Sequence, residues 1–173
     1  MLFLVLAFVL MATAGAVTFG VLRNPWAEPA APYEDAGESL PVLEALAREQ
    51  VTFLRVQDWC RAYADGSERR ANTLEGTCTL EDGYKVFDVA SEQRFTGLRN
   101  KLDDLPYDVR SIEIKYGSDG GIETAHLALD TINPFLRDSL AYDPGYVLSP
   151  GVPGEFATYR IDADWYFVRE DWN

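Results

Sequence analysis

The first twenty-two residues of the chain carry no ionisable side chain, and the first charged side chain is Arg23. At about 1.5 Å of rise per residue, a helix over residues 2–22 is roughly 31 Å long, which matches a hydrocarbon core of about 30 Å. Because a segment in lipid must satisfy its own backbone hydrogen bonds, such a run is expected to be helical there. The pattern predicts a single transmembrane anchor over residues 1–23, with the lipid bilayer as its surroundings.

Small residues recur at every fourth position of this segment. Ala12, Ala16 and Gly20 fall on one helical face, where small side chains let a second helix approach closely. We therefore expect an integral membrane protein partner at that face. Arg23 and Trp26 follow the apolar run, and both residue types suit the headgroup layer of a membrane.

A cleaved signal peptide is the alternative interpretation of the same segment. Small-x-small cleavage sites occur at residues 12–14 and 14–16. However, no Lys or Arg precedes the apolar run, and residues 17–22 remain apolar beyond both sites. These features favour a retained anchor.

The charge balance restricts the partners of the remaining chain. With 28 Asp and Glu against 15 Lys and Arg, the net charge is −13, which disfavours binding to nucleic acid phosphates. A basic protein partner would be attracted to such a domain, although an acidic surface also simply aids solubility. A hydrophobic content of 47% predicts a folded core rather than disorder.

The two cysteines, Cys60 and Cys78, indicate the compartment. A disulfide between them would close a loop of about 19 residues and contribute about 3 kcal/mol in the chain-entropy model. Because disulfides persist in oxidising compartments, the pair predicts a domain outside the cytoplasm, periplasmic or extracellular. Two buried free thiols in a cytoplasmic domain are the alternative. The spacing is not that of a redox CxxC motif, and two cysteines without a neighbouring histidine do not form a zinc site.

The chain beyond the anchor divides into a linker and one domain. Residues 24–41 hold four of the nine prolines and predict an extended linker, followed by a globular domain over residues 42–173. A long first helix is expected from an N-cap at Ser39, with Pro41 in its first turn, to residue 65. It would carry Cys60 in its last turn. A second helix is expected from an N-cap at Ser91 to residue 104.

Alternating apolar and polar residues predict strands in the rest of the domain. Three hairpins are expected, over residues 73–80 with 84–89, 109–116 with 122–129, and 156–161 with 164–169. A short helix is expected at residues 134–140. Together these elements predict an α+β fold, with an antiparallel sheet of about six strands and two helices packed on one face.

Candidate catalytic groups are few. His126 is the only histidine, so histidine triads and multi-histidine metal sites have little to draw on. Strand alternation places it on a face with Ile122, Thr124 and Ala128, where a structural role is expected. Adjacent acidic residues fit turns and helix ends. We therefore predict no enzyme activity, no catalytic residue, no cofactor and no metal.

The combined features predict a membrane-anchored accessory subunit of a larger membrane complex, for instance a respiratory or photosynthetic one, which acts through protein–protein contacts. The alternative is a secreted or periplasmic binding module released by cleavage. Tyr146, Trp165 and Trp172 are candidates for a partner surface, since aromatic residues dominate interface energetics. Core packing explains these aromatic residues equally well.

Overall fold

The computed structural model describes residues 33, 35–73, 78, 80, 82–130, 136–147 and 155–171. Among these residues, no helix has both the length and the apolar character needed to cross a bilayer. The predicted anchor lies outside the described residues. So do six residues singled out in the sequence: Ala12, Ala16, Gly20, Arg23, Trp26 and Trp172.

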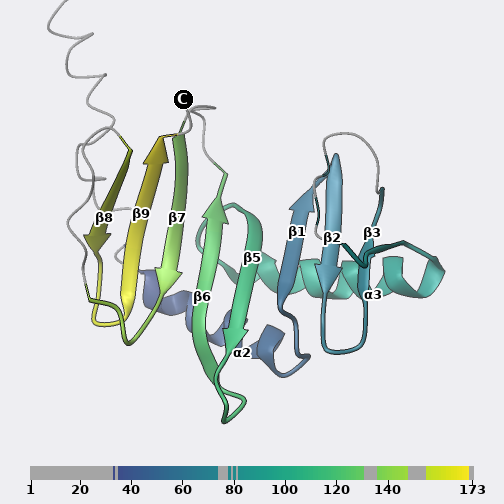
Figure 1. Ribbon diagram of the computed structural model, residues 1–173, viewed down its shortest axis with the longest axis horizontal. Helices are drawn as coiled ribbons and strands as arrows, with labels where there is room; N and C mark the ends of the chain where they lie inside the picture. Colours follow the sequence, from purple (N-terminus) through teal and green to yellow (C-terminus); the bar gives the residue numbers. More distant parts are fainter. Residues whose placement is uncertain are drawn as a thin grey trace, which may run out of the picture. The chain divides into compact units, whose positions relative to one another are not determined.

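The described residues form an α+β domain built on a mixed sheet (Figure 1). Its nine strands are β1 (Phe53–Gln57), β2 (Cys60–Ala64), β3 (Arg69–Ala71), β4 (Lys85–Val86), β5 (Val109–Tyr116), β6 (Ile122–Leu129), β7 (Leu136–Tyr142), β8 (Phe156–Arg160) and β9 (Trp165–Asp171). Their order across the sheet is β4-β3-β2-β1-β5-β6-β7-β9-β8. Strands β3 and β4 pair in parallel, and the other neighbours pair antiparallel. The predicted α+β class is confirmed, whereas the predicted antiparallel sheet of about six strands is wrong, because β1, β2 and β7 form in segments expected to be helical.

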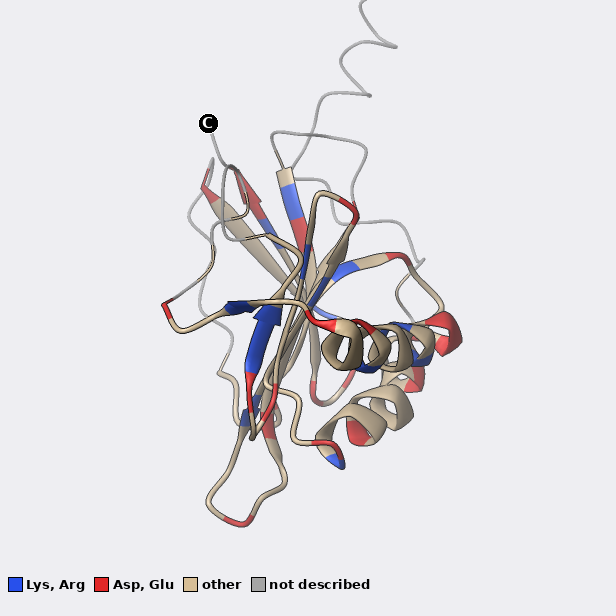
Figure 2. Ribbon diagram, turned by 90° about the vertical axis from the view of Figure 1, so that its right-hand side faces the viewer, with Lys and Arg blue, Asp and Glu red and all other residues tan. Residues whose placement is uncertain are grey.

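Two α-helices lie on the same face of this sheet, as its edge-on view shows (Figure 2). A 3₁₀ turn η1 (Ala36–Ser39) leads into α2 (Leu40–Ala47), while α3 (Val89–Arg99) continues into η2 (Asn100–Asp104). The predicted placement of two helices on one face is thus confirmed. Helix α3 connects β4 to β5, so β5 can pair with β1 in the middle of the sheet.

Helix α3 begins with a capping box. The Asp88 carboxylate accepts a hydrogen bond from the Ser91 amide at 2.8 Å, and the Ser91 hydroxyl accepts one from the Asp88 amide at 2.7 Å. These bonds satisfy two backbone donors that a helix start otherwise leaves without partners. The helix therefore starts three residues earlier than the predicted N-cap at Ser91 would place it.

The single long helix predicted over residues 39–65 does not form. Helix α2 ends at Ala47, and Gln50 turns the chain with a φ of 56° while the Val51 amide donates back to the Leu46 carbonyl at 3.2 Å. Glycine usually occupies such a left-handed position, so the helix end could not be recognised from a glutamine at residue 50. Strands β1 and β2 follow, and Cys60 lies at the start of β2 instead of in a helix.

Other boundaries also differ from the sequence prediction. The hairpins of β5 with β6 and of β8 with β9 are confirmed. Residues 134–140 were expected to be helical, but Leu136–Tyr142 form β7, because β6 and β9 on either side offer it hydrogen-bonding partners. The hairpin expected around residue 82 is absent from the described residues, where only Lys85–Val86 pair, in parallel with β3.

The core fills the space between the sheet and the helices. Its largest fully buried side chains are Tyr63, Phe95, Phe167, Leu43, Leu46, Leu54, Leu98, Ile112, Leu127 and Leu140. Residues that the sequence assigned to the linker also join the folded body. Tyr33 stacks on Phe167 with 5.0 Å between ring centroids, and Ala36 is fully buried.

A buried ion pair lies beside this stack. Both oxygens of the Asp138 carboxylate accept hydrogen bonds from the Arg169 guanidinium, each at 2.7 Å, across the β7–β9 pair. Only 6% of Asp138 is exposed. The guanidinium also lies over the Phe167 ring, 5.3 Å from its centroid. Because both side chains are largely buried, each charge depends on the other for its stabilisation.

Substitution of Asp138 by Asn is expected to destabilise the domain by about 3–5 kcal/mol, since it leaves the Arg169 charge without its carboxylate. Urea unfolding followed by circular dichroism measures this loss. Glu92→Gln is the matched control. It removes the carboxylate from the more exposed pair with Arg61, whose atoms lie 2.5 Å apart, and is expected to cost less than about 1 kcal/mol. Equal losses in the two variants would contradict the assignment.

Candidate functional site

The second face of the sheet carries the candidate site. Side chains alternate between the two faces of a strand, so those that do not point to the helices point to this side, called the open face below. On β5, Ile112 and Ile114 join the core, whereas Ser111 and Glu113 lie on the open face. Both described α-helices lie on the other face (Figure 2).

The open face is hollowed above its central strands. The hollow has a volume of about 550 Å³ and is lined by Arg55, Gln57, Trp59, Arg110, Ser111, Glu113, His126, Ala128, Arg137, Asp138, Ser139 and Glu170. Ser111, Ala128 and Ser139 lie side by side in register on β5, β6 and β7. We infer that their small side chains leave the space between the longer side chains around them. Its volume falls in the range of small-molecule sites, about 300–1,000 Å³.

A β-bulge brings Arg110 to this hollow. Val109 pairs with Leu129 and Ser111 pairs with the next residue, Ala128, so Arg110 is an extra residue in β5. Strict alternation would place Arg110 on the face of Ile112, in the core. Because of the bulge, Arg110 and Ser111 both line the hollow, and bulges are known to redirect side chains in this way.

The open face carries positive charge in a chain whose net charge is negative. Three guanidinium groups line the hollow, those of Arg55, Arg110 and Arg137. A second hollow of about 330 Å³ shares Arg55 and Glu113 with the first. It adds Arg69 and Lys115. Five cationic groups therefore line two adjoining hollows, together with the carboxylate residues Glu113, Asp138 and Glu170.

Burial acts on the arginines of the hollow. It is the largest effect that lowers the pKa of Arg55 and of Arg137, and the charge of Arg110 lowers both further. The nearby Glu113 raises the pKa of Arg55, and Glu170 raises that of Arg137. Arginine nonetheless stays protonated at neutral pH, so the hollow keeps its positive charges close together.

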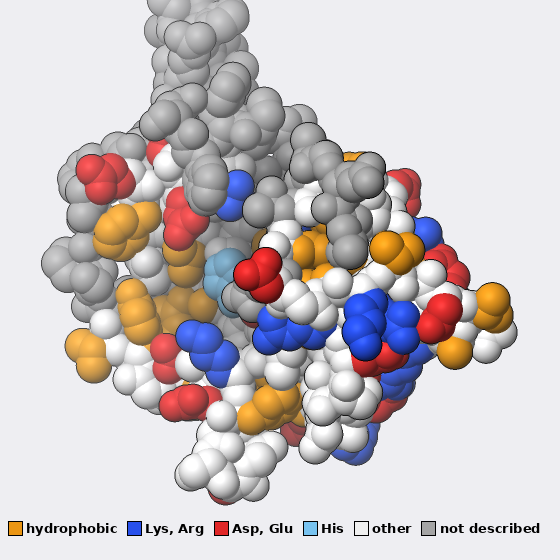
Figure 3. Space-filling view, turned by 45° about the vertical axis from the view of Figure 1, so that its right-hand side comes forward, with side chains coloured by type: hydrophobic (Ala, Val, Ile, Leu, Met, Phe, Trp, Pro, Cys, Tyr) orange, Lys and Arg blue, Asp and Glu red, His pale blue; other side chains and the backbone are white. Residues whose placement is uncertain are grey.

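His126 also lines the hollow. Figure 3 shows its pale-blue side chain with acidic and hydrophobic side chains beside it and with Lys and Arg side chains farther away. The residue is exposed, yet the surrounding protein partly desolvates its imidazole and thereby lowers its pKa. The charge of Arg110 acts in the same direction. Glu113 and Glu170 oppose this shift. The prediction that His126 and Ile122 lie on the same face of the sheet is wrong. The β5–β6 register shifts between Lys115 and Tyr116, and Ile122 packs against the core instead.

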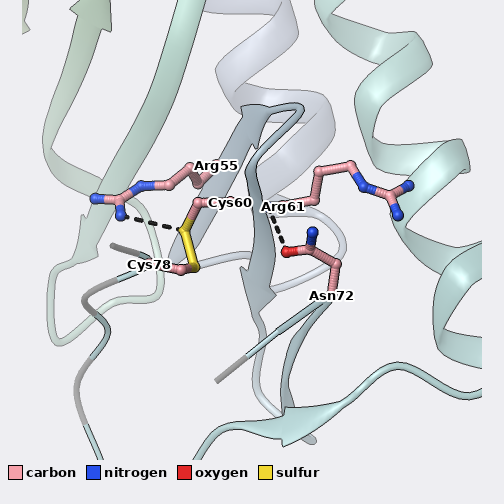
Figure 4. The surroundings of a disulfide bond; sticks show 5 residues. All are labelled: Arg55, Cys60, Arg61, Asn72 and Cys78. Carbon is pink, nitrogen blue, oxygen red and sulfur yellow. Dashed lines mark hydrogen bonds between the residues drawn. A yellow bond between two sulfur atoms is a disulfide. The ribbon is translucent and has the colours of Figure 1, made fainter. Parts of the chain in front are cut away.

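The predicted disulfide between Cys60 and Cys78 is confirmed, with 5.1 Å between the Cα atoms (Figure 4). It lies next to the open face, because the Arg55 Nη1 atom donates to the Cys60 Sγ atom at 3.5 Å. Arg61, the next residue after Cys60, extends to the other side of the sheet. Its backbone amide donates to the Asn72 side chain at 2.8 Å. The disulfide thus helps to position one cation of the hollow.

Two of the predicted partner-surface aromatics, Trp165 and Tyr146, lie outside the hollow. Trp165 is 3% exposed and packs on Tyr142 in the core, which fits the core-packing alternative. Tyr146 lies edge-on against Tyr166 at 4.7 Å and accepts a hydrogen bond from its hydroxyl through the backbone carbonyl. The exposed tryptophan of the site is Trp59, 52% exposed in the turn between β1 and β2.

The sequence contained only part of the signal for this site. The polar faces of residues 109–116 and 122–129 placed Glu113 and His126 on strands expected to pair, and the register now sets the two residues side by side. Arg55 and Trp59 were hidden because their segment was predicted to be helical. The position of Arg110 could not be predicted from the sequence, since strict alternation places a bulged residue on the wrong face of the sheet.

No side-chain cluster in the described part of the chain groups three His, Cys, Asp or Glu residues as a metal site would require. Comparisons of the chain with protein-family models, with curated proteins and with solved structures found no match. The hollow itself is therefore the basis for a functional proposal. Its arrangement of cations, hydroxyl groups and an indole suits recognition of a ligand.

Replacement of Cys60 and Cys78 by serine is expected to lower the free energy of unfolding by about 3 kcal/mol, because the unfolded chain gains conformational freedom. Urea unfolding measures the change. A reducing agent should lower the stability of the natural protein by a similar amount and leave the double variant unaffected. A double variant as stable as the oxidised natural protein would contradict this account of the disulfide.

The pKa of His126 is expected to lie below its ordinary value of 6.5 in the folded protein. The unfolded chain then binds more protons near that pH, so folding stability falls as the pH drops through 6.5. A pH titration of the imidazole NMR signal measures the pKa. Arg110→Gln should raise it and Glu113→Gln should lower it further. A pKa at or above 6.5 in the natural protein would contradict the predicted surroundings.

Proposed function

We propose that this protein is a non-enzymatic accessory subunit of a membrane complex, held at the membrane by residues 1–23, with its domain outside the cytoplasm. The domain acts by binding, and the open face is its binding surface. The observation that carries this proposal is the hollow on the open face, where arginines converge although the chain as a whole is acidic. A concave surface with a few convergent polar groups is typical of binding sites.

The disulfide supports the extracytoplasmic location. Cys60 and Cys78 form the bond within a small domain, and such bonds persist in oxidising compartments. The uncharged run of residues 1–22 supports delivery across or into a membrane. In this proposal Ala12, Ala16 and Gly20 contact an integral membrane partner, and the acidic remainder of the domain surface is available to a basic protein.

A released binding module is the second candidate function. It keeps the same domain and the same open face, and differs only in cleavage after Ala14 or Ala16. The small-x-small sequences at those positions favour it. The mature N-terminus distinguishes the two candidates.

The full chain, produced in a bacterial host, is expected to remain in the membrane fraction after alkaline extraction. Its cysteines should react with maleimide only after reduction. Leu10→Arg should weaken membrane retention, since a central arginine costs about 2.5–3.5 kcal/mol on insertion scales, whereas Leu10→Ile should not. Fractionation measures membrane retention, mass spectrometry of the N-terminus detects cleavage, and the mass added by maleimide measures the free thiols. An aqueous product that begins near residue 15 or 17 would overturn the anchor and support the released module.

A further inference from the structure

We propose that the hollow on the open face binds a sugar acid, meaning a small molecule with one carboxylate and several hydroxyl groups. This inference deepens the proposed binding function and depends on the open face being its binding surface. It does not depend on the membrane anchor. The proposal follows from the types of groups that line the hollow and from the way the strands place them.

The arginines select for a carboxylate. Arg55 extends from β1, Arg110 from the bulge of β5 and Arg137 from β7, so three different strands direct guanidinium groups to one hollow. A guanidinium offers paired donors that match the two oxygens of a carboxylate. Glu113 and Glu170 offset part of the repulsion among these cations, and the carboxylate of a ligand would add a further negative charge beside them.

The remaining polar groups select for hydroxyl groups and limit the charge of the ligand. Glu113 and Ser111 line the hollow beside the arginines, with Gln57 on the neighbouring strand. Carboxylate and amide oxygens accept hydrogen bonds from hydroxyl groups. The negative charges of Glu113 and Glu170 would repel a second or third negative charge on the ligand. The lining therefore favours a monocarboxylate over a polyphosphate.

Trp59 supplies an apolar surface at the same hollow. More than half of its side chain is exposed, at 52%, in the two-residue turn between Gln57 and Cys60. An exposed indole beside charged groups is a common anchor in recognition surfaces. The C–H face of a sugar ring provides a matching apolar surface. The volume of about 550 Å³ also suits a small ligand.

The single histidine provides a direct test. Because His126 is the only histidine and lines the hollow, the full chain labelled with ¹³C at histidine gives one imidazole signal that reports on the site. The chain is studied without a histidine tag, in a polyoxyethylene detergent that contains no sugar. The signal is followed during titration with D-glucuronate, with D-glucose, and with sodium chloride at matched ionic strength.

D-Glucuronate is expected to shift the His126 signal saturably, with a Kd in the millimolar range, whereas D-glucose and chloride leave it unchanged. Arg110→Gln and Arg137→Gln should each weaken glucuronate binding by roughly tenfold or more, as expected for loss of a charge-assisted hydrogen bond. Arg99→Gln is the matched control, since Arg99 is exposed on α3, on the other side of the sheet. It should bind glucuronate as the natural protein does.

Three results would overturn the proposal. The first is an absence of saturable shift at about 50 mM glucuronate, where a millimolar site would be filled. The second is equal binding by the natural protein and both hollow variants. The third is tighter binding of inorganic pyrophosphate than of glucuronate, which would assign the hollow to phosphate ligands. Because the signal reports on the domain alone, these outcomes are independent of the membrane fractionation test.

Discussion

The two-residue alternation of the sheet, with its helices on one face, is the constraint on which the rest of the structure depends. Each central strand must supply apolar side chains to the helices and different side chains to the open face. On β6, Leu127 lies in the core while the adjacent His126 lines the hollow. Core and candidate site are therefore two sides of the same strands, and a change of register would disturb both.

Two local features modify this alternation and shape the site. The bulge in β5 places Arg110 on the open face, whereas strict alternation would place it on the core face. The disulfide holds Cys78 against β2, where the Sγ atom of Cys60 accepts from Arg55. Both features place guanidinium groups at one hollow, where the carboxylates of Glu113 and Glu170 also lie. The proposed binding function therefore rests on the hollow and not on the acidic remainder of the surface.

Much of the fold could be predicted because its patterns are local. Ile112 and Ile114 alternate with polar residues in β5, and the hairpins of β5–β6 and β8–β9 follow from such alternation and from turn residues. The first helix was predicted too long because Gln50 adopts a left-handed conformation that its residue type does not announce. Strand β7 was missed because its hydrogen-bonding partners, β6 and β9, are distant in sequence.

The sequence by itself limited the cysteines to one possible intramolecular bond, and it determined the α+β class through periodicity. Only the tertiary structure decided the candidate site. Arg55, Arg110 and Arg137 are separated by up to 82 positions, and they meet because β1, β5, β6 and β7 are neighbours in the sheet. Strand order and bulges depend on long-range hydrogen bonding, which leaves no local pattern in the chain.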